Sequence, residues 1–204
     1  MPRWMQREPF PRASLNTRRE AALRHGLGAI CMALVLASAM AQPKPSEYDV
    51  KAAYLFNFGK FMRLSGAAGG QPRAKFEICI LGRDPIGHVL DDMSANASID
   101  NRAVRVTRTA DALVAKECDV VYISADEGEG VAADLAALGK ADVLTVSDAP
   151  DFLKRGGMIQ FVMQEGHVRF AVNLGALGRT HLVLSSELLR VASSVVGRLP
   201  EQQP

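Results

Sequence analysis

The sequence contains few of the residues from which catalytic and metal sites are usually built. Four histidines and three cysteines occur among 204 residues, and the patterns His-Glu-x-x-His, Cys-x-x-Cys and Gly-x-Ser-x-Gly are absent. His88 and Asp91 are three residues apart, a spacing that could hold a metal ion on a helix, but a solvated helix surface is the better explanation. Gly128-Glu129-Gly130 is too short for a phosphate-binding loop. The sequence therefore gives no reason to expect catalytic residues, a metal ion, a cofactor or an enzymatic activity.

The sequence also lacks an apolar run long enough to anchor it in a membrane. The run Leu27–Ala41 would rise about 22 Å as a helix, whereas a hydrocarbon core needs roughly 20 residues. Six arginines precede this run, and the small-x-small triplet Ala39-Met40-Ala41 ends it, which is the layout of a secretory signal. We expect residues 1–41 to be a cleavable signal peptide and residues 42–204 to be a single exported domain with no membrane span.

Basic charge is scarce once the signal is set aside. The whole chain has a formal net charge of +2, but residues 1–41 hold six of its 24 basic residues and two of its 22 acidic residues. Residues 42–204 therefore carry 18 basic and 20 acidic residues, a net charge of −2. Because a slightly acidic domain lacks the electrostatic attraction that nucleic acid requires, we expect no nucleic acid partner.

Helix and strand patterns alternate along residues 46–146. A capping-box spacing from Ser46 to Asp49 opens the first helix, which should end near Met62. Strands are then expected at 76–81, 104–106, 120–123 and 143–146, and helices at 84–93, 110–115 and 131–138. This alternation predicts a three-layer α/β domain with a largely parallel sheet.

The pattern changes after Phe152. Residues 158–163 and 167–172 read as the strands of a C-terminal β-hairpin, joined by a turn at Gln164-Glu165-Gly166. Ser185 or Ser186 can then cap a last amphipathic helix over residues 187–196. One edge of the sheet should therefore mix parallel and antiparallel strands.

Acidic residues follow several of the expected strands. In an open parallel sheet, ligands bind beyond the carboxyl ends of the strands, where this chain has Asp84, Asp126, Glu127 and Asp148. Such acids are similar to the magnesium pocket of a phospho-receiver domain, but no lysine ends a fifth strand. Helix-capping and turn roles are therefore the favoured explanation.

Aromatic residues are concentrated in the first helix. Five of the ten aromatics in residues 42–204 lie between Tyr48 and Phe61. Because one inward face does not use them all, the helix is either buried around most of its circumference or docks a second protein, which a homodimer contact would satisfy. On the second interpretation, the partner-binding residues are Tyr54, Leu55, Phe56, Phe58 and Met62.

Two pairs of residues are candidates for a bridging or binding role. Residues 42–204 keep two cysteines, Cys79 and Cys118, and an oxidising compartment favours a disulfide between them over two buried thiols. That bond requires the first and third strands to be neighbours, as in the sheet order 2-1-3.

Arg179 and His181 precede the capped last helix and form a candidate anion-binding site, although a solvated turn is the favoured explanation.

Several blocks of the sequence resemble the YfiR family. The first is EYDVKAAYLFNFGKF, at residues 47–61. The others follow in order along nearly all of residues 42–204, at Ile78–Gly87, Leu144–Asp148, Gly156–Val162, Val168–Leu174 and Leu184–Arg190. Agreement of several blocks at once makes the resemblance specific.

The resemblance implies a small periplasmic protein with a Rossmann-like fold. Such proteins form dimers, and the best-understood members repress an inner-membrane diguanylate cyclase by binding its periplasmic domain, which lowers cyclic-di-GMP and would limit biofilm formation. The resemblance also implies that Cys79 and Cys118 form a bridge, while residues 42–204 have no second cysteine pair. The alternative is a periplasmic small-molecule-binding protein or accessory sensor without a cyclase partner, in which Arg179 and His181 hold an anionic ligand.

Overall fold

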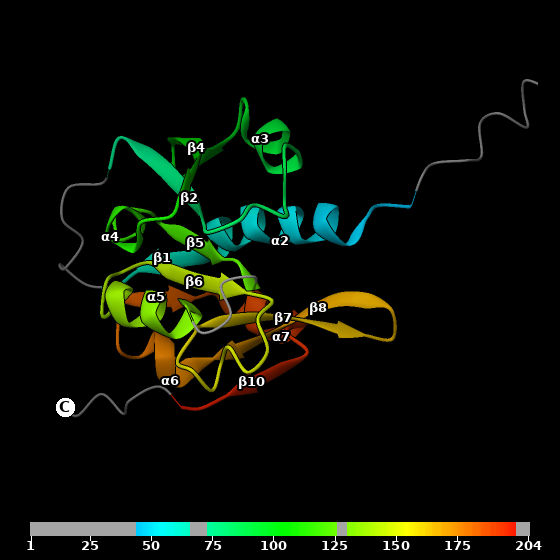
Figure 1. Cartoon of the computed structure of the whole chain (residues 1–204), viewed down its shortest axis with the longest axis vertical. Coiled ribbons are helices and arrows are strands. Elements are labelled where there is room, and N and C mark those ends of the chain that lie inside the picture. Colours follow the sequence, from blue (N-terminus) through cyan, green and yellow to red (C-terminus); the bar gives the residue numbers. More distant parts are fainter. Residues whose placement is uncertain (1–43, 66–72, 126–129, 199–204) are drawn as a thin grey trace, which may run out of the picture. The chain divides into compact units, whose positions relative to one another are not determined.

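The computed structural model describes residues 44–65, 73–125 and 130–198 (Figure 1). The signal peptide expected over residues 1–41 lies outside these ranges. Within them, no helix is both long and apolar enough to cross a membrane.

A capping box begins α2 (Glu47–Phe61), as the sequence predicts. The Ser46 N–H donates to the Asp49 carboxylate at 2.7 Å, and the Asp49 N–H donates to the Ser46 hydroxyl at 3.2 Å. These two bonds satisfy backbone donors that a helix N-terminus otherwise leaves unpaired. The helix ends where Met62 becomes extended and starts β1 (Met62–Leu64).

Eight strands form one mostly parallel sheet, in the order β10-β8-β7-β6-β5-β2-β4-β3. The strands are β2 (Lys75–Leu81), β3 (Ser98–Ile99), β4 (Arg102–Thr109), β5 (Val120–Ile123), β6 (Leu144–Ser147), β7 (Ile159–Gln164), β8 (His167–Asn173) and β10 (Ser194–Val196). A separate pair joins β1 to β9 (Leu182–Leu184) in antiparallel register. The chain is therefore a mixed α/β protein.

The central strands follow the crossover order that the cysteine pair requires. β2 lies between β4 and β5 and pairs in parallel with both. Parallel pairing continues through β6 to β7, and β8 then runs antiparallel to β7. Glu165 and Gly166 connect these two strands with φ angles of 51° and 73°, the left-handed conformation that a two-residue turn between antiparallel strands favours.

Both faces of the sheet carry a hydrophobic core. Along β2, Ile78 and Ile80 pack in the same cluster as α2, whereas Cys79 and Leu81 pack in a second cluster with α4 (Ala112–Ala115) and α5 (Gly130–Leu138). Successive residues of a strand point to opposite faces, so a strand covered on both faces is apolar without interruption. α4 and α5 lie close together on the second face (Figure 1).

The last helix is shorter than the predicted span of 187–196. Ser185 caps α7 (Ser186–Val191) by accepting from the Leu188 N–H at 3.3 Å, but the chain becomes extended at Ala192. The Ser193 N–H and hydroxyl then donate to the Phe170 carbonyl at 2.8 and 2.9 Å. Pairing with β8 at the sheet edge therefore replaces the final turns of this helix with β10.

Candidate functional site

The structure places the aromatic helix in the core of the protein. Leu55 and Phe58 are fully buried, Phe56 and Met62 are buried, and Tyr54 is half-buried. The ring of Phe58 packs edge-on against Phe170, with centroids 5.1 Å apart, and lies 5.9 Å from Phe161. The buried-helix interpretation thus accounts for most of these side chains. The apolar side chains exposed at the end of α2 and in β1 are Phe61 and Leu64.

A buried lysine ties α2 to the carboxyl end of β6. The Lys51 ammonium, 3% exposed, lies 2.5 Å from a carboxylate oxygen of both Asp148 and Glu47. The hydroxyl of Tyr122, in β5, donates to the other Asp148 oxygen at 2.8 Å. Burial by itself would lower the pKa of Lys51, but the hydrogen bonds to Asp148 and Glu47 outweigh it and raise that pKa above its ordinary value. Asp148 is therefore engaged in holding the fold together.

A second strand-end carboxylate also has a structural role. Asp84 accepts the N–H groups of Ile86 and Gly87 at 2.8 and 3.0 Å, and its other oxygen accepts from Arg108 at 2.6 Å. Arg108 also binds Asp91 of α3 (Val89–Ser94), and this hydrogen bond lowers the pKa of Asp91. The turn begun by Asp84 explains why the helix predicted over 84–93 starts at Val89.

The described residues contain no cluster of three or more histidine, cysteine or acidic side chains that could hold a metal ion. Asp126 and Glu127, the other acids expected at the strand ends, lie outside the described residues. Turn and ion-pair roles therefore account for the two strand-end acids, Asp84 and Asp148, that the structure describes.

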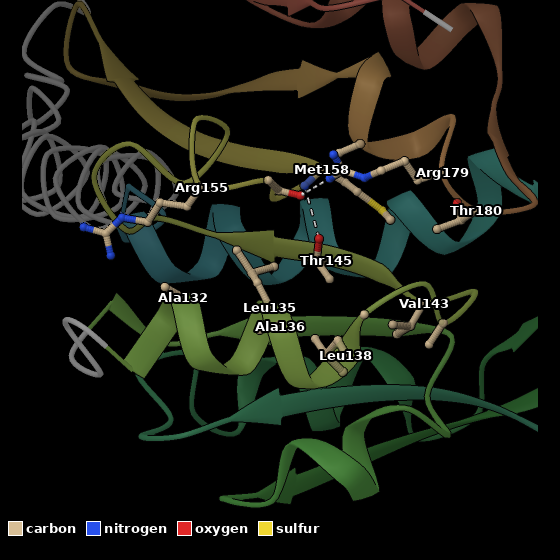
Figure 2. Close-up of a pocket in the computed structure, with 14 residues that line it drawn as sticks. Ala132, Leu135, Ala136, Leu138, Val143, Thr145, Arg155, Met158, Arg179 and Thr180 are labelled. Carbon is tan, nitrogen blue, oxygen red and sulfur yellow. Dashed lines mark hydrogen bonds between the residues drawn. The ribbon is translucent and has the colours of Figure 1, made fainter. Parts of the chain in front are cut away.

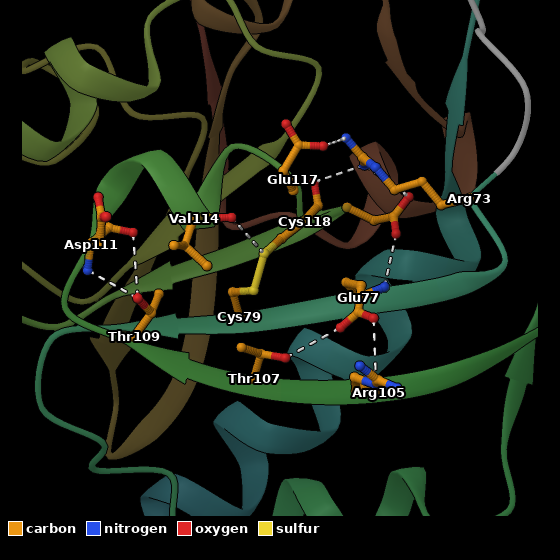
Figure 3. The surroundings of a disulfide bond; sticks show 11 residues. Arg73, Glu77, Cys79, Arg105, Thr107, Thr109, Asp111, Val114, Glu117 and Cys118 are labelled. Atoms are coloured by element: carbon orange, nitrogen blue, oxygen red, sulfur yellow. Dashed lines mark hydrogen bonds and ion pairs between the residues drawn. A yellow bond between two sulfur atoms is a disulfide. The ribbon is translucent and has the colours of Figure 1, made fainter.

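A disulfide joins Cys79 in β2 to Cys118 just before β5 (Figure 3). The two Cα atoms are 6.1 Å apart, which the neighbouring positions of β2 and β5 make attainable. Both residues are almost fully buried beneath α4 and α5 in the second core. The bridge therefore fastens the central strand of the sheet to the start of its neighbour.

An open groove runs beside the disulfide over β2 and β4. Ion pairs cross its rim from Arg73 to Glu117 at 3.5 Å and from Arg105 to Glu77 at 3.6 Å (Figure 3). Arg73 also donates to the Cys118 carbonyl at 3.3 Å. These pairs balance most of the charge on the groove, so its surroundings show no strong preference for a ligand of one sign.

The candidate anion-binding residues Arg179 and His181 point to different surroundings. Arg179 lines a cavity and donates to the Gly156 carbonyl at 3.2 Å (Figure 2). His181 is absent from the described lining of this cavity, and its ring Nδ1 lies 3.0 Å from Asp142. Asp142 precedes β6, so the contact between His181 and Asp142 lies at the amino end of this strand. The sequence suggests a ligand at the opposite end, beyond the carboxyl ends of the strands.

The cavity brings Arg179 close to residues that no sequence motif marks. Arg155, Thr180 and Met158 line it, together with apolar side chains of α5. These residues are spread over about 50 positions of the chain and share no motif. The sequence feature that could have pointed to this cavity is the pair Gly156-Gly157, because adjacent glycines indicate a turn whose backbone conformation other residues adopt with difficulty.

A solved structure shares the fold. A crystal structure of a conserved domain protein from Vibrio cholerae O1 biovar El Tor matches with a TM-score of 0.50 and 11% sequence identity. The alignment covers 75% of this chain and 61% of that chain, so this chain spans less than two-thirds of the length of its structural relative. At this identity the similarity shows the fold alone. No curated protein matches the sequence.

The sequence matches the profile of a known family over most of its length. The profile is described as YfiR/HmsC-like and matches residues 48–193, which include all of α2 except Glu47, the disulfide and the strands β1 to β9. This match agrees with the resemblance carried by the sequence blocks. The chain therefore belongs to the YfiR/HmsC-like family.

Proposed function

We propose that the protein is a periplasmic regulator that represses an inner-membrane diguanylate cyclase, or a related membrane sensor, by binding its periplasmic domain. The observation that carries this proposal is the family match over residues 48–193, since the family suggests a periplasmic regulator in cyclic-di-GMP signalling. A protein on the outer side of the membrane alters a cytoplasmic product through a partner that crosses the membrane. The expected effect is a lower level of cyclic-di-GMP.

The end of α2 and the β1–β9 pair supply a docking surface for this partner. Phe61, Leu64 and Val183 are large apolar residues, each between 38% and 49% exposed. Arg63 lies opposite Val183 in the register of β1 and β9, so this surface also carries positive charge. Buried Phe56, Phe58 and Met62 support it from within, because they fix the end of α2 against the sheet. Aromatic residues and arginine are enriched in protein–protein interfaces.

The disulfide supports the same function by keeping the fold rigid in an oxidising compartment. Residues 42–204 have two cysteines, and both belong to the Cys79–Cys118 bridge. We propose that this single bridge stabilises the binding-competent domain and that the protein forms a homodimer. Light scattering of the purified domain tests the dimer, since a mass of one chain at micromolar concentration would contradict it.

Gene deletion followed by complementation tests the repressor function. In the deletion strain we expect cyclic-di-GMP and biofilm to rise, and the wild-type gene to restore both. Phe61→Ser should fail to restore them, whereas Leu113→Ser should succeed, because Leu113 is an exposed apolar residue of α4, a helix that packs on the other hydrophobic cluster through Ala112 and Ala115. Unchanged cyclic-di-GMP after deletion, in a strain shown to express a candidate cyclase, would contradict repression.

A further inference from the structure

A cavity of about 200 Å³ lies between α5, the turn at Arg155–Gly156 and the end of α6 (Leu174–Leu177) (Figure 2). Apolar side chains form part of its walls, beside polar atoms of the arginines, threonines and backbone: Leu135 and Leu138 come from α5, and Val143 and Met158 come from the segments that lead into β6 and β7. Leu138, Val143 and Met158 are buried, so these walls belong to the core and keep their positions when a ligand enters.

The charged lining of the cavity has one sign. Arg155 and Arg179 line it, and none of its described lining residues is acidic. The two arginines lie toward opposite ends of the opening, and Arg155 extends away from its centre (Figure 2). Arg179 is therefore the arginine that is placed for direct contact with a ligand.

Three described groups in or next to the lining, Asp142, Thr145 and Thr180, already have hydrogen-bond partners. Asp142, which precedes the lining residue Val143, accepts the backbone N–H of His181 at 2.8 Å and lies 3.0 Å from its ring. The Thr145 hydroxyl accepts from the Met158 N–H at 3.1 Å, and the Thr180 hydroxyl donates to the Leu177 carbonyl at 2.8 Å. Arg179 donates one hydrogen bond to the Gly156 carbonyl. A guanidinium has five N–H donors, so this bond leaves others that can face a ligand.

The glycine turn holds Arg179 at this position. Gly156 has a φ of +100°, and a Cβ atom there would lie 3.2 Å from the Arg179 guanidinium. A Cβ atom on Gly157 would lie 2.1 Å from the ring of Phe152, which is impossible without a shift. Both positions thus require glycine, so that the turn can pack closely and present the Gly156 carbonyl to Arg179.

We propose that this cavity binds a small organic anion, with its carboxylate on Arg179 and its apolar part against Leu135, Leu138 and Met158. An apolar cavity of about 150 Å³ can hold benzene. A volume of about 200 Å³ therefore accommodates one ring or a short alkyl chain with a carboxylate. This volume is below the about 300 Å³ at which sites for drug-sized molecules begin, so the cavity suits a small ligand. The site is separate from the proposed docking surface and does not require a cyclase partner.

Titration of the purified domain with benzoate and with benzamide tests this proposal. The two probes have nearly the same shape, but benzoate carries the charge that Arg179 would bind. We expect benzoate to bind, with NMR shifts at Leu135, Leu138 and Met158, and benzamide to bind at least about tenfold more weakly, the size of a lost charge-assisted hydrogen bond. Equal binding of the two probes, or no binding of benzoate at millimolar concentration, overturns the proposal.

Three variants locate the site. Arg179→Gln should weaken benzoate binding by about tenfold or more, whereas Arg169→Gln should leave it unchanged, since Arg169 is an exposed residue of β8 outside the described lining. Ala136→Phe should block binding without removing charge, because Ala136 is exposed on α5 and lines the cavity. Wild-type benzoate affinity in the Ala136→Phe variant, with an unchanged circular dichroism spectrum, overturns the assignment even if Arg179→Gln fails to fold.

Discussion

Lys51 and Asp148 form a buried ion pair, 2.5 Å between Nζ and Oδ2, that connects the first turns of α2 to the residue following β6. Glu47 and Tyr122 complete the group. The pair therefore helps to fix the angle at which the aromatic helix lies on the sheet, and with it the position of the proposed docking surface at the far end of the helix.

We predict that Lys51→Met lowers the free energy of unfolding by about 3–5 kcal/mol, because it leaves the Asp148 carboxylate without its buried cation. Urea denaturation measures the change. Lys154→Met is the matched control, since Lys154 forms an exposed pair with Asp151 at 2.8 Å, and exposed pairs contribute about 0–1 kcal/mol. A similar loss of unfolding free energy in both variants would contradict the prediction that the Lys51 pair contributes more to stability than an exposed pair.

Lys51 also predicts the pH dependence of stability. Its pKa is raised in the folded state from the ordinary value of 10.5, so its contribution is fully present below that pH and is lost as pH rises through the raised value. We expect the stability difference between wild type and Lys51→Met to be constant from neutral pH to about pH 10 and to shrink above it. Urea titrations at a series of pH values measure this difference. A difference that grows with alkaline pH would contradict the assignment.

Removal of the disulfide should destabilise the domain without changing its fold. The bridge spans a sequence separation of 39 residues, and the chain-entropy relation gives about 4 kcal/mol for a loop of this length. We expect the Cys79→Ala/Cys118→Ala double variant to unfold at a lower urea concentration with an unchanged circular dichroism spectrum. A reducing agent should lower the urea concentration at which the wild-type protein unfolds, but not that of the double variant. An unchanged unfolding concentration for the reduced wild type would argue against this role of the bridge.

The intact mass of the protein isolated from cells tests the expected signal and the bridge together. We predict a chain that begins at Gln42, with Cys79 and Cys118 protected from alkylation until a reducing agent is added. A mass that retains Met1 would contradict cleavage after Ala41. Alkylation of both thiols without reduction would contradict the bridge.

Phe58 and Phe61 should separate folding from binding. Phe58 is fully buried against Phe161 and Phe170, so Phe58→Ala should cost about 3–5 kcal/mol of stability. Phe61 is 38% exposed, so Phe61→Ser should leave the melting temperature within a few degrees of wild type and weaken binding to the periplasmic domain of the partner. Calorimetry and a pull-down with that domain measure the two effects. Wild-type binding by Phe61→Ser would remove this residue from the docking surface.

The sequence predicts those parts of the fold that depend on local chemistry. The capping box of Ser46 and Asp49 was predictable because its two bonds join residues three positions apart. The buried strands β2, β5 and β6 were predictable from continuous apolar runs, and the requirement for a bridge between Cys79 and Cys118 correctly placed β2 beside β5. The three-residue strands β1, β9 and β10 were missed, because their pairing is decided by neighbours distant in the sequence.

Burial was harder to predict than secondary structure. The aromatic residues of α2 fit both a core helix and a docking helix, and only the positions of Phe161 and Phe170 show that Phe58 belongs to the core. Lys51 reads as a surface lysine because its partner Asp148 lies 97 residues away in the chain. Arg179 was selected for its place before a helix, but the cavity that it lines is formed by α5 and a glycine turn far from it in sequence.

The aromatic contacts of α2 also determine when the domain can fold. The ribosome releases α2 first, yet the rings that cover Phe58 belong to β7 and β8, near the end of the chain. Until those strands emerge, the most aromatic segment of the domain has no permanent cover, and contacts between such distant segments form slowly. The core around α2 therefore closes late, after nearly the whole domain has been synthesised.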